Sequence, residues 1–346
     1  MSNELERYSK QILFAGLNED RQRLLLNSRV LLCGCGALGT VLADTLVRAG
    51  VGFLRIVDRD FVEMSNLQRQ VLFDEQDVAS HIPKAIAAAE KLRRINGDVT
   101  IEPHVADISH TNILRFTEGV DLILDGTDNF EIRFLINDAS LETGIPWIYA
   151  GVIGSHGQTM TVFPNQTACL RCLIEAVPEP GSTETCDTAG VLGAAVNVIS
   201  SLESIDALKI LSGQPELIKP KLTIVDVWDA TFRRMNTAGL RDRSNCPACQ
   251  QGEREWLSGK EGSQTTILCG RNAVQVSPSG KVAVSFEELA PKVAEVGTVD
   301  FNQYLLRFEL SDPAYQVTVF RDGRAIIKGT EDISVARGIY ARYIGA

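Results

Sequence analysis

The sequence predicts an α/β fold with a doubly wound, mainly parallel sheet, and three observations support this prediction. Short apolar segments alternate with helical segments up to residue 150, which is the pattern of βαβ units. A glycine-rich turn, Gly34-Cys-Gly-Ala-Leu-Gly39, directly follows the first apolar segment and opens a helical one. After Gly157 the pattern changes to the alternation of a half-buried strand. We therefore expect a Rossmann-like parallel sheet with an antiparallel continuation.

The first elements follow from periodicity and from helix-ending residues. A polar, amphipathic stretch runs from Leu5 to Asn27, and a buried strand follows at Arg29–Cys33. The glycine turn then leads into a helix from about Ala37 to Ala49, which Gly50 ends. The next strand is Phe53–Val57, so these segments form one complete βαβ unit.

The next segments continue the alternation. A second helix opens at Pro83, which suits a first helical position, and runs to about Asn96. Apolar strands follow at Val120–Leu124 and Trp147–Ala150, and Gln158–Phe163 has the alternating pattern. The run Ala189–Ile199 mixes small and apolar residues and predicts a core helix, because it is too short and too mixed to span a membrane.

The chain is expected to have three parts. Residues 1–250 form the large domain, residues 251–265 are polar and glycine-containing and serve as a linker, and residues 266–346 form a small α+β module. Within the module, Tyr315–Phe320 and Arg324–Lys328 flank an Arg-Asp-Gly turn and predict a hairpin. A helix near residues 333–343 closes the module.

Composition limits the classes of function. The chain has 346 residues, 45% of them hydrophobic and 23% charged, as expected for a globular protein. The formal net charge of −10 argues against nucleic acid as a partner, because phosphate binding needs clustered Lys and Arg. Neither a secretory signal nor a membrane span is evident, and eight cysteines fit a reducing compartment. We expect a cytoplasmic protein that does not bind membranes.

Four of the cysteines form two Cys-x-x-Cys pairs, Cys169 with Cys172 and Cys246 with Cys249. Four thiolates are the ligand set of a closed structural Zn²⁺ site, whereas catalytic zinc keeps one position open. The long separation of the pairs predicts a zinc knuckle that joins distant segments rather than a finger. The alternatives are redox-active or buried thiols and, less favoured, disulfides, and turn formers around the second pair argue against simple burial.

The glycine turn and the strand that follows it predict a nucleotide site. Gly34 and Gly36 permit a tight turn and close backbone approach to a phosphate, and Gly39 permits helix–strand packing. Asp58 ends the next strand, about 20 residues on, where an acidic side chain meets a ribose. The fingerprint alone is equally compatible with a nicotinamide-dependent oxidoreductase.

Several further motifs, taken in order, resemble the ThiF/MoeB/HesA family, the bacterial relatives of ubiquitin-activating enzymes. The resemblance spans roughly residues 4 to 250 and leaves the terminal module outside. The motifs that carry it are Arg7-Tyr-Ser-Lys-Gln-Ile12, Gly34–Gly39, Asp58-Arg-Asp60, Ser65-Asn-Leu-Gln-Arg-Gln70, Pro83-Lys84, Thr127-Asp-Asn129 and the two cysteine pairs. Lys10 stands where the family often has arginine, which keeps the charge but changes the geometry.

The resemblance implies a reaction in which ATP adenylates the C-terminal glycine of a ubiquitin-like sulfur carrier and pyrophosphate is released. A carboxylate that attacks a phosphate needs positive charge around the triphosphate, and Arg69 and Lys84 fit this need. Lys84 also lies at a predicted helix start, which favours phosphate. Taken singly, Arg69 and Lys84 are more often solvated charges, and Asp58 is often a cap, but their joint occurrence favours the functional reading.

The resemblance also assigns nucleotide and Mg²⁺ contacts. Asp58 is implied to hold the ribose, and Asp128 to hold Mg²⁺ that bridges the phosphates. The remaining polar residues expected to contact the nucleotide are Asp60, Asn66, Gln70 and Asn129. Of these, Asp60 has an alternative role in which it only supports Asp58.

The implied partners are a second copy of the chain and a carrier of the ThiS or MoaD type. In the family, the arginine equivalent to Arg7 reaches into the partner subunit's ATP site, so a homodimer is expected. Cys186 belongs to neither cysteine pair and is a candidate nucleophile for the carrier during sulfur transfer from a donor protein, with a structural role as the alternative. Cys269 comes too early in its module for a rhodanese-type persulfide cysteine.

The carrier decides the pathway. The Asp322-Gly-Arg-Ala sequence of the module resembles the tails of ThiF-like thiamine proteins, which favours a ThiS-like carrier and thiazole synthesis over a MoaD-like carrier and molybdopterin synthesis. Two other classes are an oxidoreductase, which leaves Arg69, Lys84 and Asp128 unexplained, and a non-catalytic scaffold, which should lack phosphate or Mg²⁺ ligands. None of the named ligands is missing.

Overall fold

The computed structural model describes residues 3–174, 189–261, 265–268, 272–277, 284–311 and 314–344. They divide into two compact units. The larger unit holds the described residues up to Glu261, apart from Ala189, and the smaller unit holds those from Thr265 onward. Each unit has a sheet and a hydrophobic core of its own.

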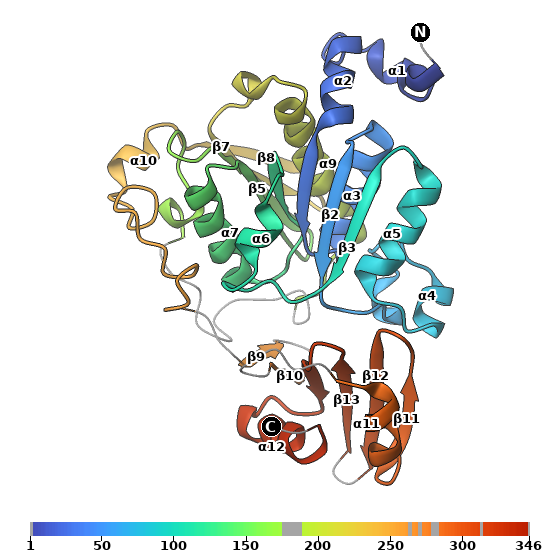
Figure 1. The fold of residues 1–346 in the computed structure, drawn as a ribbon. Helices are drawn as coiled ribbons and strands as arrows, with labels where there is room; N and C mark the ends of the chain where they lie inside the picture. Colours follow the sequence, from blue (N-terminus) through green and yellow to red (C-terminus); the bar gives the residue numbers. More distant parts are fainter. Residues whose placement is uncertain are drawn as a thin grey trace. The chain divides into compact units, whose positions relative to one another are not determined.

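The larger unit is built on an eight-stranded sheet of order β3-β2-β1-β4-β5-β6-β7-β8 (Figure 1). Its strands are β1 (Arg29–Cys33), β2 (Phe53–Asp58), β3 (Thr100–Val105), β4 (Leu122–Asp125), β5 (Trp147–Ile153), β6 (His156–Val162), β7 (Lys221–Asp226) and β8 (Thr231–Asn236). The strands from β3 to β5 pair in parallel, whereas those from β5 to β8 pair antiparallel. The predicted parallel sheet with an antiparallel continuation is therefore confirmed.

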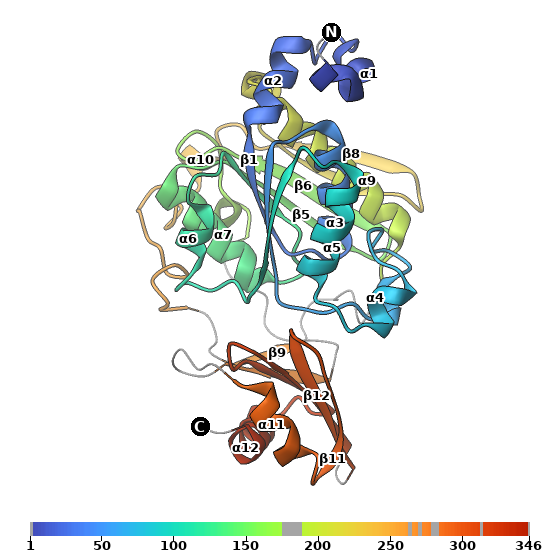
Figure 2. The same ribbon diagram turned by 45° about the vertical axis from the view of Figure 1, so that its right-hand side comes forward.

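Helices cover both faces of this sheet, as Figure 2 shows. The described helices of this unit are η1 (Asn3–Tyr8), α1 (Ser9–Ile12), α2 (Glu19–Asn27), α3 (Ala37–Ala49), η2 (Met64–Asn66), α4 (Glu75–Ala79), α5 (Lys84–Ile95), α6 (Ile113–Thr117), α7 (Phe130–Thr143), η3 (Leu170–Cys172), α9 (Gly193–Leu211), η4 (Pro215–Leu217) and α10 (Leu240–Arg243). Helices α3, α5 and α9 share one core, and α6 and α7 share the other.

Strand β1 shows why the fold is doubly wound. Val30 and Leu32 belong to the core under α3, whereas Leu31 and Cys33 belong to the core under α7. Because successive side chains of a strand point to opposite faces, an all-apolar strand requires helices on both sides. The continuous apolar run in the sequence thus specifies a central strand.

Two expected helix starts are wrong by a few residues. Pro83 is not the first helical residue but the cap before α5, where its extended backbone forms a bridge with Phe61. The helix expected from Ala189 begins instead at Gly193 and runs to Leu211. Its start is delayed because Val191 bridges to Gly154, which holds the chain extended before the helix.

From Thr265 onward, the described residues of the smaller unit form an antiparallel sheet of order β11-β12-β13-β14-β10-β9 and two helices. Its elements are β9 (Thr265–Leu268), β10 (Ala273–Val276), α11 (Phe286–Val293), β11 (Gly297–Phe301), β12 (Leu305–Ser311), β13 (Ala314–Phe320), β14 (Ala325–Lys328) and α12 (Ile333–Tyr343). Strands β13 and β14 form the expected hairpin, with Gly323 at φ +82° in its turn. The expected closing helix is α12.

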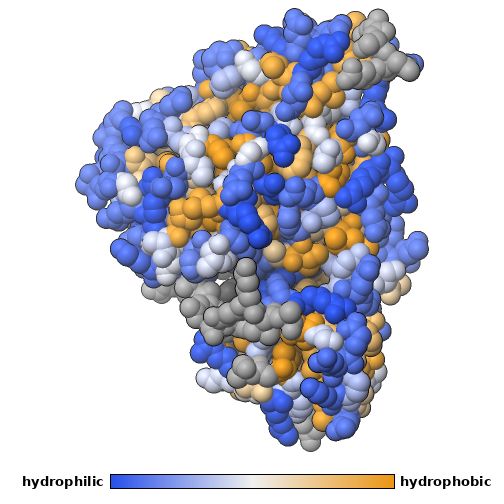
Figure 3. Space-filling model, in the orientation of Figure 1, coloured by the Kyte–Doolittle hydropathy of each residue, from blue (hydrophilic) through white to orange (hydrophobic). Residues whose placement is uncertain are grey.

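The described helices include none that is long and apolar enough to cross a bilayer. On the face drawn in Figure 3, hydrophilic and hydrophobic side chains are interspersed.

Candidate nucleotide site and cysteine cluster

The glycine turn lies between β1 and α3, where the strand order changes direction. The chain proceeds from β1 to β2 and β3 on one side and then to β4 on the other side. In open α/β sheets, ligands bind beyond the carboxyl ends of the strands at such a switch point. The turn therefore stands where a nucleotide site is expected.

The three glycines of this turn are present for different structural reasons. Gly34 has a φ of +88°, and a Cβ atom on Gly39 would lie 2.1 Å from the carbonyl oxygen of Gly34. Gly126, which follows β4, packs against the same carbonyl group, since a Cβ atom on Gly126 would lie 2.4 Å from the Gly34 oxygen. By contrast, a Cβ on Gly36 would meet nothing closer than 3.9 Å. The protein therefore leaves room beside Gly36, at the N-terminus of α3.

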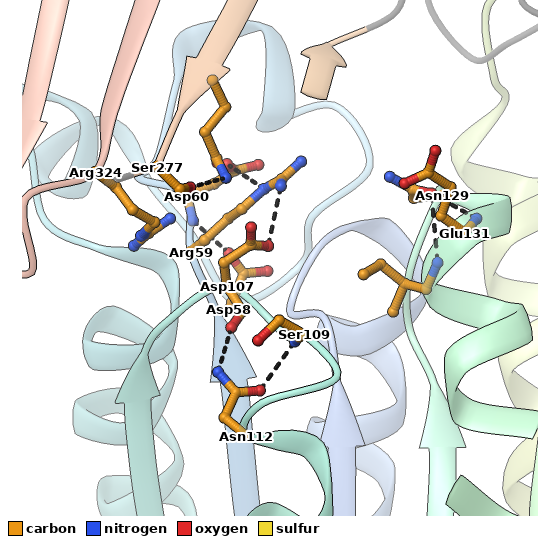
Figure 4. A network of polar contacts seen from close by, with 12 residues as sticks. Asp58, Arg59, Asp60, Asp107, Ser109, Asn112, Asn129, Glu131, Ser277 and Arg324 are labelled. Atoms are coloured by element: carbon orange, nitrogen blue, oxygen red, sulfur yellow. Dashed lines mark hydrogen bonds and ion pairs between the residues drawn. The ribbon is translucent and has the colours of Figure 1, made fainter. Parts of the chain in front are cut away.

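Asp58 connects the end of β2 to the glycine turn. Its Oδ2 accepts a hydrogen bond from the Cys35 backbone N–H at 2.6 Å, and its Oδ1 accepts one from the Asp60 N–H at 2.7 Å. Burial raises the pKa of Asp58, and the positive charge of Lys84 opposes this shift. Figure 4 shows Asp58 and Asp60 close to Arg59, which is ion-paired with Asp107 at 3.0 Å.

Lys84 is a buried cation at this edge of the sheet. It is the first residue of α5 and only 3% exposed. Its Nζ lies 3.3 Å from Asp60 Oδ2, and its backbone N–H donates to the Asp60 carbonyl at 2.9 Å. A buried lysine is rare unless it is paired, so Asp60 stabilises the charge of Lys84 inside the site.

The segment after β2 brings Asn66, Arg69 and Gln70 to the same region. Asn66 is buried, and its Oδ1 accepts the Glu63 N–H at 3.1 Å. Gln70 is also buried, with its Nε2 beside Gly36, and its Oε1 has no hydrogen-bond partner in the part of the chain that the structure describes. The Arg69 side chain donates to the Ser65 carbonyl at 2.8 Å and has no carboxylate partner among the described residues.

Strand β4 and α7 provide the opposite side of the site. Asp128 is exposed in the turn that follows Gly126. Asn129 caps α7, since its Oδ1 accepts the Glu131 N–H at 2.8 Å, and Figure 4 shows it at this helix start. This cap leaves only the amide Nδ2 of Asn129 for a ligand.

Two residues that flank this turn, one at the end of β4 and one on α7, were not among the site residues predicted from the sequence. Asp125 is completely buried, and Arg133 pairs with it through Nε at 3.0 Å. The Asp125 Oδ1 also accepts the backbone N–H and the hydroxyl of Thr127, at 2.9 and 2.7 Å. A charged residue at the end of an apolar strand was the available signal for Asp125, whereas nothing local pointed to Arg133.

Arg7 lies far from the site of its own subunit. Its Nη1 donates to the carbonyl of Ile95 at 2.8 Å, at the C-terminal end of α5. Lys84 occupies the other end of that helix, about 17 Å away at 1.5 Å per residue. The structure therefore does not bring Arg7 together with Lys84 within one chain.

The four paired cysteines meet in one cluster. Their sulfur atoms all lie within 4.8 Å of one another, and the pairs measured are Cys169–Cys246 at 3.7 Å, Cys169–Cys172 at 3.9 Å and Cys172–Cys249 at 3.4 Å. A tetrahedron with zinc–sulfur bonds of 2.3 Å has edges of about 3.8 Å, whereas a disulfide needs about 2.05 Å. The cluster thus fits a closed zinc site and not disulfides.

Neighbouring groups hold the cluster in place. Asn137 of α7 accepts the Leu170 N–H at 2.9 Å, within the first pair. Asp138, the next residue of α7, accepts the backbone N–H groups of Trp256 at 3.0 Å and Leu257 at 3.3 Å, after the second pair. Helix α7 therefore connects both segments of the knuckle. Cys186 and Cys269 lie outside the described residues.

The fold and the two sites define an α/β nucleotide-binding protein that carries a four-thiol cluster. The model of the ThiF family matches residues 8–248, and this chain belongs to that family.

The chain is also similar to individual proteins. It is 42% identical to "Sulfur carrier protein ThiS adenylyltransferase" of Bacillus subtilis (strain 168), across 98% of this chain and 99% of that protein. It is 37% identical to "SAMP-activating enzyme E1" of Haloferax volcanii, across 72% of this chain and 91% of that protein. Among solved structures, E. coli MccB shares the fold, with a TM-score of 0.61 at 22% identity across 71% of this chain and 74% of that one.

Proposed function

We propose that this protein adenylates the C-terminal glycine of a ubiquitin-like sulfur carrier with ATP and releases pyrophosphate. The observation that carries the proposal is a buried lysine beside a glycine turn at the switch point of a ThiF-family fold. The names of the relatives from Bacillus subtilis and, at 35% identity, Thermus thermophilus support the same activity. Membership of this family also argues against the oxidoreductase alternative.

The reaction joins two anions that repel each other, and the site has positive charges that can reduce this repulsion. A carboxylate oxygen of the carrier attacks the α-phosphorus of ATP, and the bond from that phosphorus to the β-phosphate oxygen breaks. Lys84 and Arg69 would neutralise charge on the triphosphate. Lys84 is held by Asp60, whereas Arg69 has no carboxylate among the described residues and can turn its guanidinium to phosphate.

The other contacts follow from the geometry of the turn. A phosphate can approach Gly36 because no protein atom fills the space that its Cβ would take. Gln70 lies next to that space, with an oxygen that no described residue hydrogen-bonds, and the Oδ1 of Asn66 is used within the chain while its Nδ2 can face a ligand. Asp58 accepts hydrogen bonds from two backbone N–H groups. Each of its carboxylate oxygens still has a lone pair that can accept a hydrogen bond from a ribose hydroxyl.

Asp128 would hold Mg²⁺, which is typically bound through one or two carboxylates together with substrate phosphates. When bound, the ion would neutralise and orient the triphosphate. The exposed position of Asp128, next to the glycine turn, suits this role. The cysteine cluster would hold Zn²⁺ as a structural element, with all four positions filled by sulfur.

We propose a homodimer in which Arg7 completes the site of the partner subunit. About 17 Å separates Arg7 from Lys84 of its own chain along α5, so a role for Arg7 in catalysis requires a second copy. A mixture of Arg7→Ala and Asp128→Ala chains tests this directly. In an equimolar mixture that pairs at random, half of the dimers are mixed and each of these holds one intact site of two. Activity should therefore recover to about a quarter of the wild-type value, whereas an Arg7 that acts within its own chain gives no recovery.

The carrier is proposed to be of the ThiS type, with thiamine thiazole synthesis as the pathway. The relative named for ThiS matches the chain through its C-terminal unit, whereas the alignment with "SAMP-activating enzyme E1" covers only 72% of this chain. A MoaD-type carrier remains the second candidate. We also propose that Cys186 forms a covalent bond with the carrier and that a separate protein donates the sulfur. The same proposal places the protein in the cytoplasm.

ATP/pyrophosphate exchange with Mg²⁺ tests the proposed function. Exchange should require a carrier that ends in Gly-Gly and should disappear when the terminal glycine is removed. Comparison of ThiS-type with MoaD-type carriers then identifies the pathway. Exchange that is independent of the carrier tail, or that is absent with both carriers, contradicts the proposal.

A further inference from the structure

Glu203 is an ionisable residue in the core of the nucleotide-binding unit. It lies on the inward face of α9 with Val196, Ile199 and Ala207, at the three- and four-residue spacing of a buried helix stripe. Its side chain is completely buried, and neither carboxyl oxygen has a hydrogen-bond partner among the described residues. An apolar residue is expected at this position, so the carboxyl group requires an explanation.

The surroundings of Glu203 already contain a complete ion pair. Asp125, at the end of β4, and Arg133, on α7, act on Glu203, and they are paired with each other at 3.0 Å. Tyr149 of β5 belongs to the same cluster, since its ring centre is 5.4 Å from the Arg133 guanidinium carbon. The Arg133 charge is thus matched by Asp125, and a second buried carboxylate would have no counter-charge.

The location of this cluster connects it to the proposed catalytic turn. Asp125 is followed directly by Gly126, which packs against Gly34 and Gly39, and then by Asp128. Helix α9 also contacts the start of α3, since Ser200 Oγ donates to the Leu38 carbonyl at 3.3 Å. A change at Glu203 is therefore placed to move both the glycine turn and the Asp128 turn.

We propose that Glu203 is a positioning residue that supports the Asp125–Asn129 turn as a neutral carboxylic acid, and that ionisation of Glu203 displaces this turn. Burial raises the pKa of Glu203 well above its usual range, and the negative charge of Asp125 raises it further, whereas the positive charge of Arg133 opposes the shift. A neutral acid has nearly the shape of glutamine. Glutamine should therefore replace Glu203 without loss of the fold.

The sign of the effect on stability follows from proton binding. Between the ordinary glutamate pKa and the raised pKa of the folded state, the folded chain holds a proton at Glu203 that the unfolded chain has lost. Stability attributable to this group therefore falls as pH rises through that interval. Glu203→Gln removes the titration, so the variant should be more stable than the wild type, and increasingly so as pH rises.

The test measures the melting temperature of full-length wild type, Glu203→Gln and Glu216→Gln between pH 5 and 9. Glu216 is exposed just after α9 and serves as the matched control. We expect Glu203→Gln to melt several degrees higher than the wild type at pH 8, by roughly 5 °C, with a smaller difference at pH 5. A difference that does not change with pH, or a variant less stable than the wild type throughout, overturns the proposal.

A second readout tests the positioning role and rests on the proposed function. Pyrophosphate exchange by Glu203→Gln should be within twofold of the wild type at pH 7, on the order of a few tenths of a kcal/mol. It should also persist at alkaline pH, where the wild type declines. An alkaline decline that is identical in both proteins overturns the positioning role. Because melting does not depend on exchange, failure of the proposed function leaves the first readout intact.

Discussion

The nucleotide site and the cysteine cluster lie in the same unit and show opposite designs. At the nucleotide site, Lys84 is buried with a carboxylate, and Gly36 has room for a Cβ atom. Gln70 there has an oxygen without a hydrogen-bond partner among the described residues. In the cysteine cluster, four sulfur atoms converge on one point and backbone groups around them are hydrogen-bonded. The first arrangement suits a ligand that binds and dissociates, whereas the second suits an ion that stays bound.

The largest effect is expected from a substitution that removes one ligand of the cysteine cluster. Cys249→Ser should release the bound zinc and lower the melting temperature by more than about 10 °C, because structural zinc contributes on the order of 10 kcal/mol to folding. Metal content by mass spectrometry and a thermal melt measure both changes. Cys33→Ala is the matched control, since Cys33 is equally buried but outside the cluster. An unchanged metal content in Cys249→Ser contradicts the zinc assignment.

The next largest effect is expected from a substitution that inactivates the nucleotide site and leaves the fold intact. Asp128→Ala should reduce pyrophosphate exchange by about 10³-fold, equivalent to about 4 kcal/mol of transition-state stabilisation, and leave the melting temperature unchanged. The fold is spared because the Asp128 side chain is exposed. Glu118→Ala, another exposed carboxylate of the same unit, should keep full activity. Normal exchange by Asp128→Ala would remove the proposed magnesium role.

Two glycines of one turn sharpen the contrast between packing and binding. Gly39→Ala places a methyl group 2.1 Å from the Gly34 carbonyl oxygen and should destabilise the protein by about 3 kcal/mol. Gly36→Ala has room for the methyl group and should leave stability within about 0.5 kcal/mol, while it raises the KM for ATP about tenfold. Melting curves and kinetics separate the two. Equal destabilisation by both substitutions contradicts the room for a methyl group at Gly36.

The smallest effect concerns Asp138, which couples α7 to the knuckle. Burial raises the pKa of Asp138 to about 6. The folded state therefore binds a proton that the unfolded state has lost between about pH 4 and 6, and stability should fall by about 3 kcal/mol at most as pH rises through this range. Asp138→Asn should lack this dependence in urea unfolding experiments. A variant that shows the wild-type slope contradicts the assignment.

Local patterns in the sequence were sufficient for much of the fold. Strand β1, helix α3 and the hairpin of β13 and β14 are found where apolar periodicity and turn residues predict them. The start of α9 was missed because a bridge between Val191 and Gly154, far apart in sequence, holds the chain extended. Such long-range pairings have no local signature.

The same limit applies to the sites. The cysteine cluster was predictable because two short motifs supply all four ligands, and the structure brings them together. The Asp125–Arg133 pair and the buried Glu203 were not, since each depends on side chains from different elements that meet only in the folded core. Motif spacing reports residues that act within one segment, and it is silent on contacts between segments.

The most direct test of the central claim is the mass of the carrier protein after incubation with this protein, ATP and Mg²⁺. The carrier should gain the mass of one AMP group on its C-terminal glycine. Asp128→Ala should prevent this gain, and a carrier without that glycine should be unchanged. A carrier that remains unmodified while pyrophosphate is released, or that carries AMP at another residue, contradicts the account.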